Sequence, residues 1–153
     1  MSSSMDSASI TMIAALVFLV VMSAYFSATE TAFSSLNRVR MKSKADGGNQ
    51  RAALALELEE DYDRLLSTIL IGNNIVNITA TTVSTVLFTK LLPVYGPTVS
   101  TVVLTVIILI FGEISPKSLA KENAEDFAMF SAPILRVFIA LLRPVNFLFT
   151  QWK

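Results

Sequence analysis

The feature that most constrains this chain is a set of apolar runs, each long enough to cross a lipid bilayer. Ile10 to Phe26 is almost entirely apolar, and two further long runs follow it along the chain. A hydrocarbon core about 30 Å thick needs about 20 helical residues to span it. The sequence therefore predicts an all-α membrane protein with three transmembrane helices, at about 10–36, 65–92 and 98–115.

Composition narrows the chemistry that such a protein can carry. Of its 153 residues 53% are hydrophobic, the formal net charge is zero, and Cys and His are absent. Disulfides, structural zinc sites and thiol catalysis are thereby excluded, and any bound metal must be held by oxygen. Zero net charge gives no indication of nucleic-acid binding. Because there is also no phosphate-binding loop, we expect a protein that is not an enzyme.

The polar segment between the first two spans predicts a helical hairpin. Residues 37–64 are polar, Asp46–Asn49 is a strong turn signal, and the Ala, Leu and Glu residues that follow favour a helix. We expect this hairpin to lie at the cytoplasmic face of the membrane.

The last segment, about 123–152, predicts an amphipathic belt beside the membrane. It is apolar enough to suggest a fourth span, but Arg136 would then lie at the bilayer centre, at a cost of about 2.5–3.5 kcal/mol. Arg143 is seven residues further on, which would place both Arg side chains on one helix face. We expect Pro133 and Pro144 to break the segment into pieces that lie in the plane of the membrane.

The distribution of Lys and Arg predicts the orientation. The tail 1–9 has none, six lie between the first and second spans, Lys90 alone lies between the second and third, and five follow the third. Cytoplasmic loops carry the excess of basic residues. We therefore expect an extracellular tail at 1–9, a single transmembrane domain at 10–153, and a cytoplasmic C-terminus in the plasma membrane. The missing basic start indicates that the first run is a retained span and not a cleaved signal.

Three sets of polar residues lie within the predicted spans, where burying a polar group in the bilayer costs free energy. The sets are Ser23, Ser27, Glu30 and Ser34; Asn73, Asn74 and Asn77; and Gly112, Glu113, Pro116 and Lys117. Each set has a structural interpretation: helix packing for the Ser residues, an interhelical clamp for the Asn residues, and a salt bridge at a helix end for Glu113 and Lys117. Glu30 could equally lie at the inner interface, in contact with water.

The depths of these sets favour one shared site. At about 1.5 Å per residue, Asn73 lies about 12 Å from the inner end of its helix, and Ser27 and Glu113 also fall in the inner half of the bilayer. Pro116 should kink its helix about one turn earlier and free carbonyl groups near Gly112. Hydroxyl, amide, carboxylate and carbonyl oxygens suit a hard cation such as Mg²⁺, Ca²⁺, Mn²⁺ or Na⁺. The types of ligand in these sets do not distinguish one of these ions from another.

At these positions the chain resembles the transmembrane domain of the CorC/CNNM (cyclin M) magnesium transporters. The resemblance rests on SATETAFSSLN at Ser27–Asn37, GNNIVN at Gly72–Asn77 and GEISPK at Gly112–Lys117, and it covers about Ile10 to Trp152. The three motifs together are specific, whereas one alone would be weak.

The resemblance implies a homodimer in the lipid bilayer that exports Mg²⁺, with Na⁺ entry as the coupled flow. It implies that Ser27, Asn77 and Glu113 hold the ion, with Ser23 and Asn74 next to them. Accessory positions would be Glu30, Asn73, Gly112, Pro116 and Lys117. Full-length family members continue into cytosolic CBS domains, which are absent from this sequence. The alternative function is a membrane anchor and dimerisation module that positions a cytosolic sensor without transporting ions.

Overall fold

The computed structural model describes residues 6–152, and this part of the chain is built from helices. The elements in chain order are α1 (Ser7–Ser35), α2 (Arg38–Asp46), α3 (Gln50–Glu60), α4 (Tyr62–Leu91), α5 (Gly96–Ile107), the π-helical segment η2 (Ile108–Ile114), α6 (Ser115–Glu122), α7 (Ala124–Leu141) and α8 (Arg143–Trp152).

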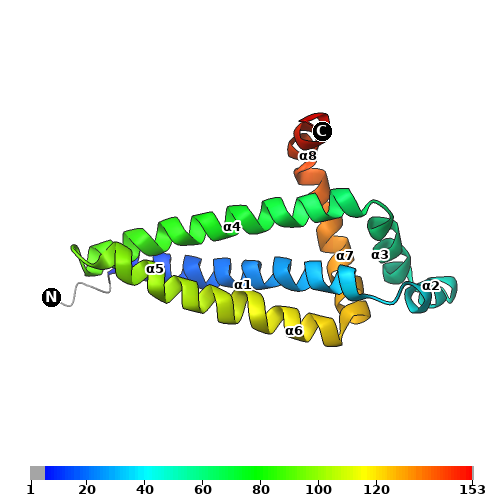
Figure 1. Ribbon diagram of the computed structural model, residues 1–153, viewed down its shortest axis with the longest axis horizontal. Helices are drawn as coiled ribbons and strands as arrows, with labels where there is room; N and C mark the ends of the chain where they lie inside the picture. The colour runs from blue at the N-terminus through cyan, green and yellow to red at the C-terminus, as the bar shows by residue number, and fades with distance from the viewer. Residues whose placement is uncertain (1–5, 153) are drawn as a thin grey trace.

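Three long helical rods lie side by side and form the body of the molecule (Figure 1). They are α1, α4 and the continuous run Gly96–Glu122, and each is long and apolar enough to cross a membrane. The all-α fold with three spanning helices is therefore confirmed. The third rod extends beyond the predicted 98–115, because the helix does not end at Pro116 but continues as α6 to Glu122.

The third rod changes its hydrogen-bonding pattern just before Pro116. The N–H of Ser115 donates to the carbonyl of Ile110, five residues earlier, as in a π-helix. Proline has no N–H to donate and its ring displaces the preceding turn, so the irregularity lies where Pro116 predicts it. This π-helical turn carries Gly112 and Glu113 into the region between the rods.

The segment between α1 and α4 forms the two short helices α2 and α3. Asn37 caps α2 by accepting the Arg40 N–H at 3.0 Å, and Asn49 caps α3 by accepting the Ala52 N–H at 3.0 Å. Gly48, at φ 99°, lies in the left-handed region between them. The two helices pack against each other, and their location at the membrane surface stays a prediction.

The C-terminal segment runs across the bundle near the α2–α3 end and then turns into α8 (Figure 1). The prediction that Pro133 breaks it is wrong: Pro133 lies inside α7, where buried Ala128, Ala132 and Leu135 hold the helix on both sides of the lost hydrogen bond. The break falls at Leu142, just before Pro144. Arg136 and Arg143 consequently lie on different helices and not on one helix face; the role of α7 and α8 as a membrane belt stays a prediction.

Glu125 connects this segment to the rods. Its carboxylate accepts the Asn37 N–H at 3.0 Å and the Arg40 guanidinium at 2.9 Å, where α1 turns into α2. The pKa of Glu125 is lowered, first by the Asn37 hydrogen bond and then by Arg40. An ionised Glu125 therefore fixes the start of α7 against the end of α1.

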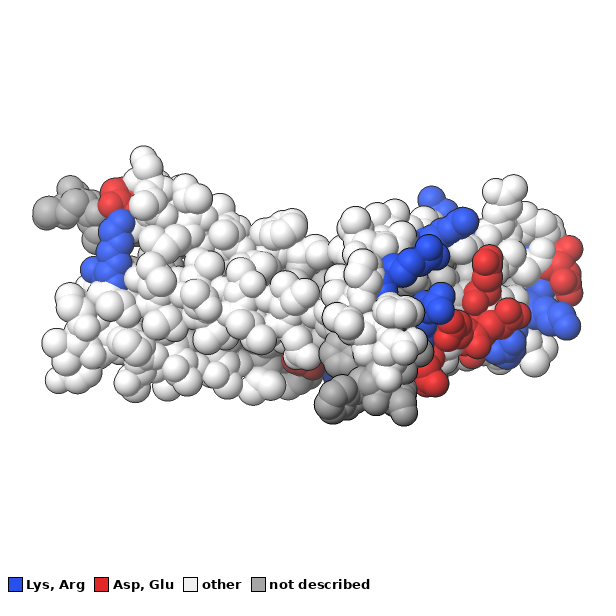
Figure 2. Space-filling view, turned by 90° about the horizontal axis from the view of Figure 1, so that it is seen from above, with Lys and Arg blue, Asp and Glu red and all other residues white. Residues whose placement is uncertain are grey.

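Charged side chains are segregated to the ends of the molecule. Figure 2 shows most of them over the α2–α3 end, a small group at the opposite end, and an almost uncharged stretch between. At the N-terminal end, Lys90 pairs with Asp6 at 2.6 Å and, with the Ser9 N–H, lowers the Asp6 pKa to about 2. An uncharged stretch between two charged ends is the pattern of a membrane-spanning body.

Candidate cation site

The central contact of the site joins α1 to the π-helical turn of the third rod. The Ser27 hydroxyl, which is buried, donates to one carboxylate oxygen of Glu113 at 3.3 Å. The Glu113 side chain is 27% exposed, so it is not fully enclosed between the helices. Sequence analysis placed these two residues together on depth alone, and the structure brings them into contact.

A second polar contact lies one helical turn along α1. The buried Ser23 hydroxyl donates to the side-chain oxygen of Asn73 on α4 at 3.4 Å. Gly112 lies against the same hydroxyl: a Cβ built on this glycine would be 3.0 Å from the Ser23 oxygen. Ser23, Asn73 and Gly112 thus bring all three rods together beside the Ser27–Glu113 pair, and a larger residue at position 112 would crowd them.

The other residues that the sequence predicted for the site differ in their burial and in their contacts. Asn77 lies one turn along α4 from Asn73, and its side-chain oxygen is buried without a hydrogen-bond partner. Pro116 is half-buried at the end of the π-helical turn. The Asn74 side chain is exposed, and the structure does not bring it into the cluster. Glu30 is half-buried and lies near Tyr62 of α4.

Lys117 already supplies a positive charge to the site. Its ammonium lies 3.2 Å from the second carboxylate oxygen of Glu113, one turn further along the helix. The Lys117 side chain is 43% exposed, so it can move into solvent at little cost. Glu113 therefore has one oxygen bonded to a hydroxyl and the other to a displaceable cation.

The donor set defines the ion that this arrangement suits. Among residues 6–152, no group of three or more Asp, Glu, His or Cys side chains could hold a metal ion. A cation at this site would have one carboxylate, with hydroxyl and amide oxygens completing its shell. Hard cations such as Mg²⁺ and Na⁺ accept such ligands, and Mg²⁺ usually retains several waters.

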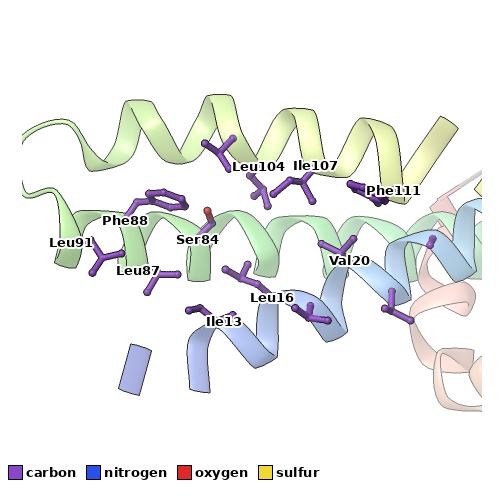
Figure 3. Close-up of a pocket in the computed structure, with 14 residues that line it drawn as sticks. Ile13, Leu16, Val20, Ser84, Leu87, Phe88, Leu91, Leu104, Ile107 and Phe111 are labelled. Atoms are coloured by element: carbon purple, nitrogen blue, oxygen red, sulfur yellow. The ribbon is translucent and has the colours of Figure 1, made fainter. Parts of the chain in front are cut away.

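A large apolar cavity lies elsewhere in the described part of the chain. It has a volume of about 680 Å³ and lies between α1, α4 and the third rod, toward the N-terminal end (Figure 3). Leu16, Leu87 and Phe111 are among the residues that line it, and its one hydroxyl, on Ser84, points toward α5 and bonds to Ser100 at 2.6 Å. With no free polar group to ligate an ion, this cavity is not the cation site.

Sequence analysis missed a second group of polar residues between α4 and α5. Thr81, Ser100, Thr101 and Thr105 line a groove there together with Asn77. The available signal was their spacing: Thr81 follows Asn77 by four residues and Thr105 follows Thr101 by four, which places each pair on one helix face.

The fold and the site define a class: a helical membrane domain with three spans and a polar cluster between them. A comparison with protein families assigns it further. Residues 14–152 match the family model described as the cyclin M transmembrane N-terminal domain. The chain therefore belongs to the cyclin M (CNNM) family, which confirms the resemblance.

Curated relatives agree with this assignment. The chain is 40% identical to a UPF0053 protein of Haemophilus influenzae over 87% of its own length and 32% of the relative's. It is 38% identical to the UPF0053 inner membrane protein YfjD of Escherichia coli, over 82% of the chain and 29% of the relative. A chloroplastic DUF21 domain-containing protein of Arabidopsis thaliana is 34% identical over 86% of the chain and 20% of the relative. The chain thus spans a third or less of the length of these relatives.

Proposed function

We propose that this domain binds Mg²⁺ between its three spans and transports it across the plasma membrane, with Na⁺ entry as the coupled flow. The observation that carries the proposal is the Glu113 carboxylate, set on a π-helical turn inside the bundle and bonded to the buried Ser27 hydroxyl. Ionisable groups within spans mark ion pathways, and irregular helix at membrane depth is tolerated where it lines such a site. Membership of the cyclin M family supports the same role.

The surrounding residues suggest how the ion would be held. Glu113 would supply the charge, and neutral oxygens would come from Ser27, Ser23, Asn73 and the unpaired amide of Asn77. Water would complete the shell. The arriving ion would displace the Lys117 ammonium from Glu113, so that the carboxylate never remains uncompensated. With the α2–α3 end in the cytoplasm, as the basic residues predict, the ion would enter from inside the cell. A homodimer would be the working unit.

A second candidate function is a membrane anchor that dimerises and positions cytosolic domains. The observation that favours it is the pairing within the cluster: Glu113 with Lys117 and Ser27, and Ser23 with Asn73. Such pairs would suffice to fasten the three spans together without an ion.

Mg²⁺ titration of the purified chain, followed by calorimetry, separates the two functions. For the wild type we expect saturable binding. Glu113→Gln removes the only charge of the ligand set and should weaken binding about tenfold or more, because hydrogen bonds and contacts to a charged group are worth about 1.5–3 kcal/mol. Far-UV circular dichroism and size-exclusion chromatography would establish that the variant keeps its fold and assembly.

Glu122→Gln is the matched control. Glu122 is exposed at the end of the same rod, and the exchange changes charge by the same amount. The Mg²⁺ affinity of Glu122→Gln should equal that of the wild type, whereas that of Glu113→Gln should fall about tenfold or more. No saturable binding by folded wild-type protein, or equal binding by both variants, would favour the anchor.

A further inference from the structure

The apolar cavity of Figure 3 lies between α1 and the third rod, with α4 behind it, and we call it the apolar slot. Two close contacts account for its position. Gly112 lies against the Ser23 hydroxyl, which brings the π-helical turn close to α1. Gly96 lies against the backbone of Thr89, which brings the start of α5 close to α4. The third rod therefore packs on α4 at one end and on α1 at the other, and a space of about 680 Å³ remains between α1 and α5.

The apolar slot is open to the side of the molecule. Val17 and Val21 on α1 and Phe111 on the third rod line the slot, and each of them is about 60% exposed. These residues lie on the spanning helices, between the two charged ends of the molecule, where a bilayer places its hydrocarbon. The opening therefore faces lipid.

The lining of the slot suits hydrocarbon and not water. A buried water needs two to four polar partners, whereas within the described residues the lining has a single hydroxyl, on Ser84, which is already bonded to Ser100 at 2.6 Å. A void of this size would deprive the side chains around it of dispersion contacts. An acyl chain from the surrounding bilayer would restore those contacts.

The length of the slot matches one leaflet of a bilayer. Its lining runs along α1 from Ile13 to Ala24, and this separation of eleven residues corresponds to about 16 Å at about 1.5 Å per residue. Half of a hydrocarbon core about 30 Å thick is about 15 Å, which is the depth that the chains of one leaflet fill. Since a dry cavity of about 150 Å³ accommodates benzene, a slot more than about four times as large has room for one long acyl chain.

An ion pair lies at the end of the slot where such a chain would join its headgroup. Lys90 pairs with Asp6 at 2.6 Å, and the pair connects the end of α4 to the start of α1, beyond Leu91 and Ile13, which line the slot. Both charged side chains are partly exposed, at 36% and 45%. An anionic headgroup would be attracted by Lys90 and repelled by Asp6, whereas a zwitterionic headgroup presents a phosphate to one and an ammonium to the other.

We propose that the apolar slot binds one acyl chain of a zwitterionic phospholipid from the leaflet at the N-terminal end, with the headgroup beside Lys90 and Asp6. The bound chain would pack between α1 and α5 and stabilise the folded bundle, because a ligand of the folded state raises its stability. This site does not depend on whether the domain transports Mg²⁺.

Lipid retention measures the site directly. The protein is purified from membranes in detergent, and phospholipid that stays bound is counted by native mass spectrometry. We expect one phosphatidylethanolamine per chain for the wild type. Val103→Phe adds a ring inside the slot and should lose the lipid. Val102→Phe is the matched control and should retain it, because the neighbouring Val102 is 60% exposed and does not line the slot.

Thermal unfolding of the delipidated protein in detergent tests what the slot recognises. Dioleoyl phosphatidylethanolamine should raise the Tm saturably, by about 5–11 °C at about 100 times its dissociation constant. Dihexanoyl phosphatidylethanolamine, whose chains are too short to fill the slot, should raise the Tm much less. Dioleoyl phosphatidylglycerol, which is anionic, should require a higher concentration. If Val103→Phe does not fold, Val20→Phe fills the slot from α1 and should lose both the retained lipid and the rise in Tm.

Equal lipid retention by folded Val103→Phe and Val102→Phe, or no saturable rise in the Tm of the folded wild type, would overturn the site. An equal rise with the dihexanoyl lipid would show that no acyl chain fills the slot, and tighter binding of phosphatidylglycerol would refute the role of the ion pair. Dissociation of a dimer by Val103→Phe alone, with no lipid retained by the wild type, would assign the slot to a second copy of the chain and overturn the proposal.

Discussion

Gly72 is the position where a single methyl group tests the packing of the spans most directly. A Cβ added there would lie 2.5 Å from Cζ and 2.8 Å from Cε1 of Phe26. Carbon atoms in ordinary contact are about 3.5–4.0 Å apart, so the ring would have to retreat by about 1 Å. Phe26 is 1% exposed and its ring lies 5.4 Å from those of Tyr25 and Phe138, which leaves no free space for the movement.

The expected cost of Gly72→Ala follows from this crowding. Inserting a methyl into a well-packed core costs about 1–3 kcal/mol. In water, alanine would recover about 1 kcal/mol of helix propensity, but a span keeps its backbone hydrogen bonds in lipid, so this gain is small here. At about 2–4 °C per kcal/mol for a chain of this size, the Tm should fall by about 2–12 °C.

Thermal unfolding in detergent measures this change, with Gly47→Ala as the matched control. A Cβ at Gly47 would meet only carbonyl oxygens at 3.5 Å, which is ordinary contact, so its Tm should stay close to that of the wild type. Equal Tm values for Gly72→Ala and the wild type would show that α1 and α4 are not packed as described. The Ser23–Asn73 contact between the same two helices would then also be in question.

Two further predictions concern charged groups at the α2–α3 end of the bundle. Lys117→Met removes the ammonium that would compete with Mg²⁺ for Glu113. Since a partly exposed ion pair is worth about 0.5–1 kcal/mol, the Mg²⁺ affinity measured by titration should rise about 2- to 5-fold. Lys121→Met is the control and should leave the affinity unchanged. Weaker binding by Lys117→Met would instead show that the ammonium positions the carboxylate. The folded pKa of Glu125 lies below its ordinary value of 4.5, so its stabilisation is present above that value and is lost as pH falls through the folded pKa. Glu125→Gln should therefore lower the Tm at pH 7, by an amount that shrinks below pH 4.5. A loss of Tm that is equal at pH 7 and below pH 4.5 would contradict the contacts of the ionised carboxylate. Glu122→Gln, at an exposed position, is the control and should show no such trend.

The number of membrane-spanning helices could be predicted from sequence because the lipid bilayer determines what can span it. Apolar length alone requires helices that cross a bilayer, and turn residues such as Gly47 and Gly48 mark where the chain reverses. The effect of Pro116 was predictable because a missing N–H acts locally. Pro133 was misjudged because buried neighbours on both of its sides hold α7 together, and sequence does not report that packing.

The pairing of polar residues could be predicted only in part. Depth along each helix brought Ser27 and Glu113 to one level, but the rotation of a helix about its axis decides which side chains face inward. On α4 that rotation places Gly72 against Phe26, which turns Asn73 toward Ser23. Asn74, about 100° further around the helix, is consequently exposed.

The sequence by itself determined that this protein spans a membrane as three helices, that any metal it binds is held by oxygen, and which polar residues lie at membrane depth. These properties follow from composition and from rise per residue, both of which are local. Only the tertiary structure decided that Glu113 pairs with Ser27 and Lys117, and that the side-chain oxygen of Asn77 is buried without a hydrogen-bond partner. Those contacts depend on how closely and at what rotation three helices pack, which is a property of their side chains taken together.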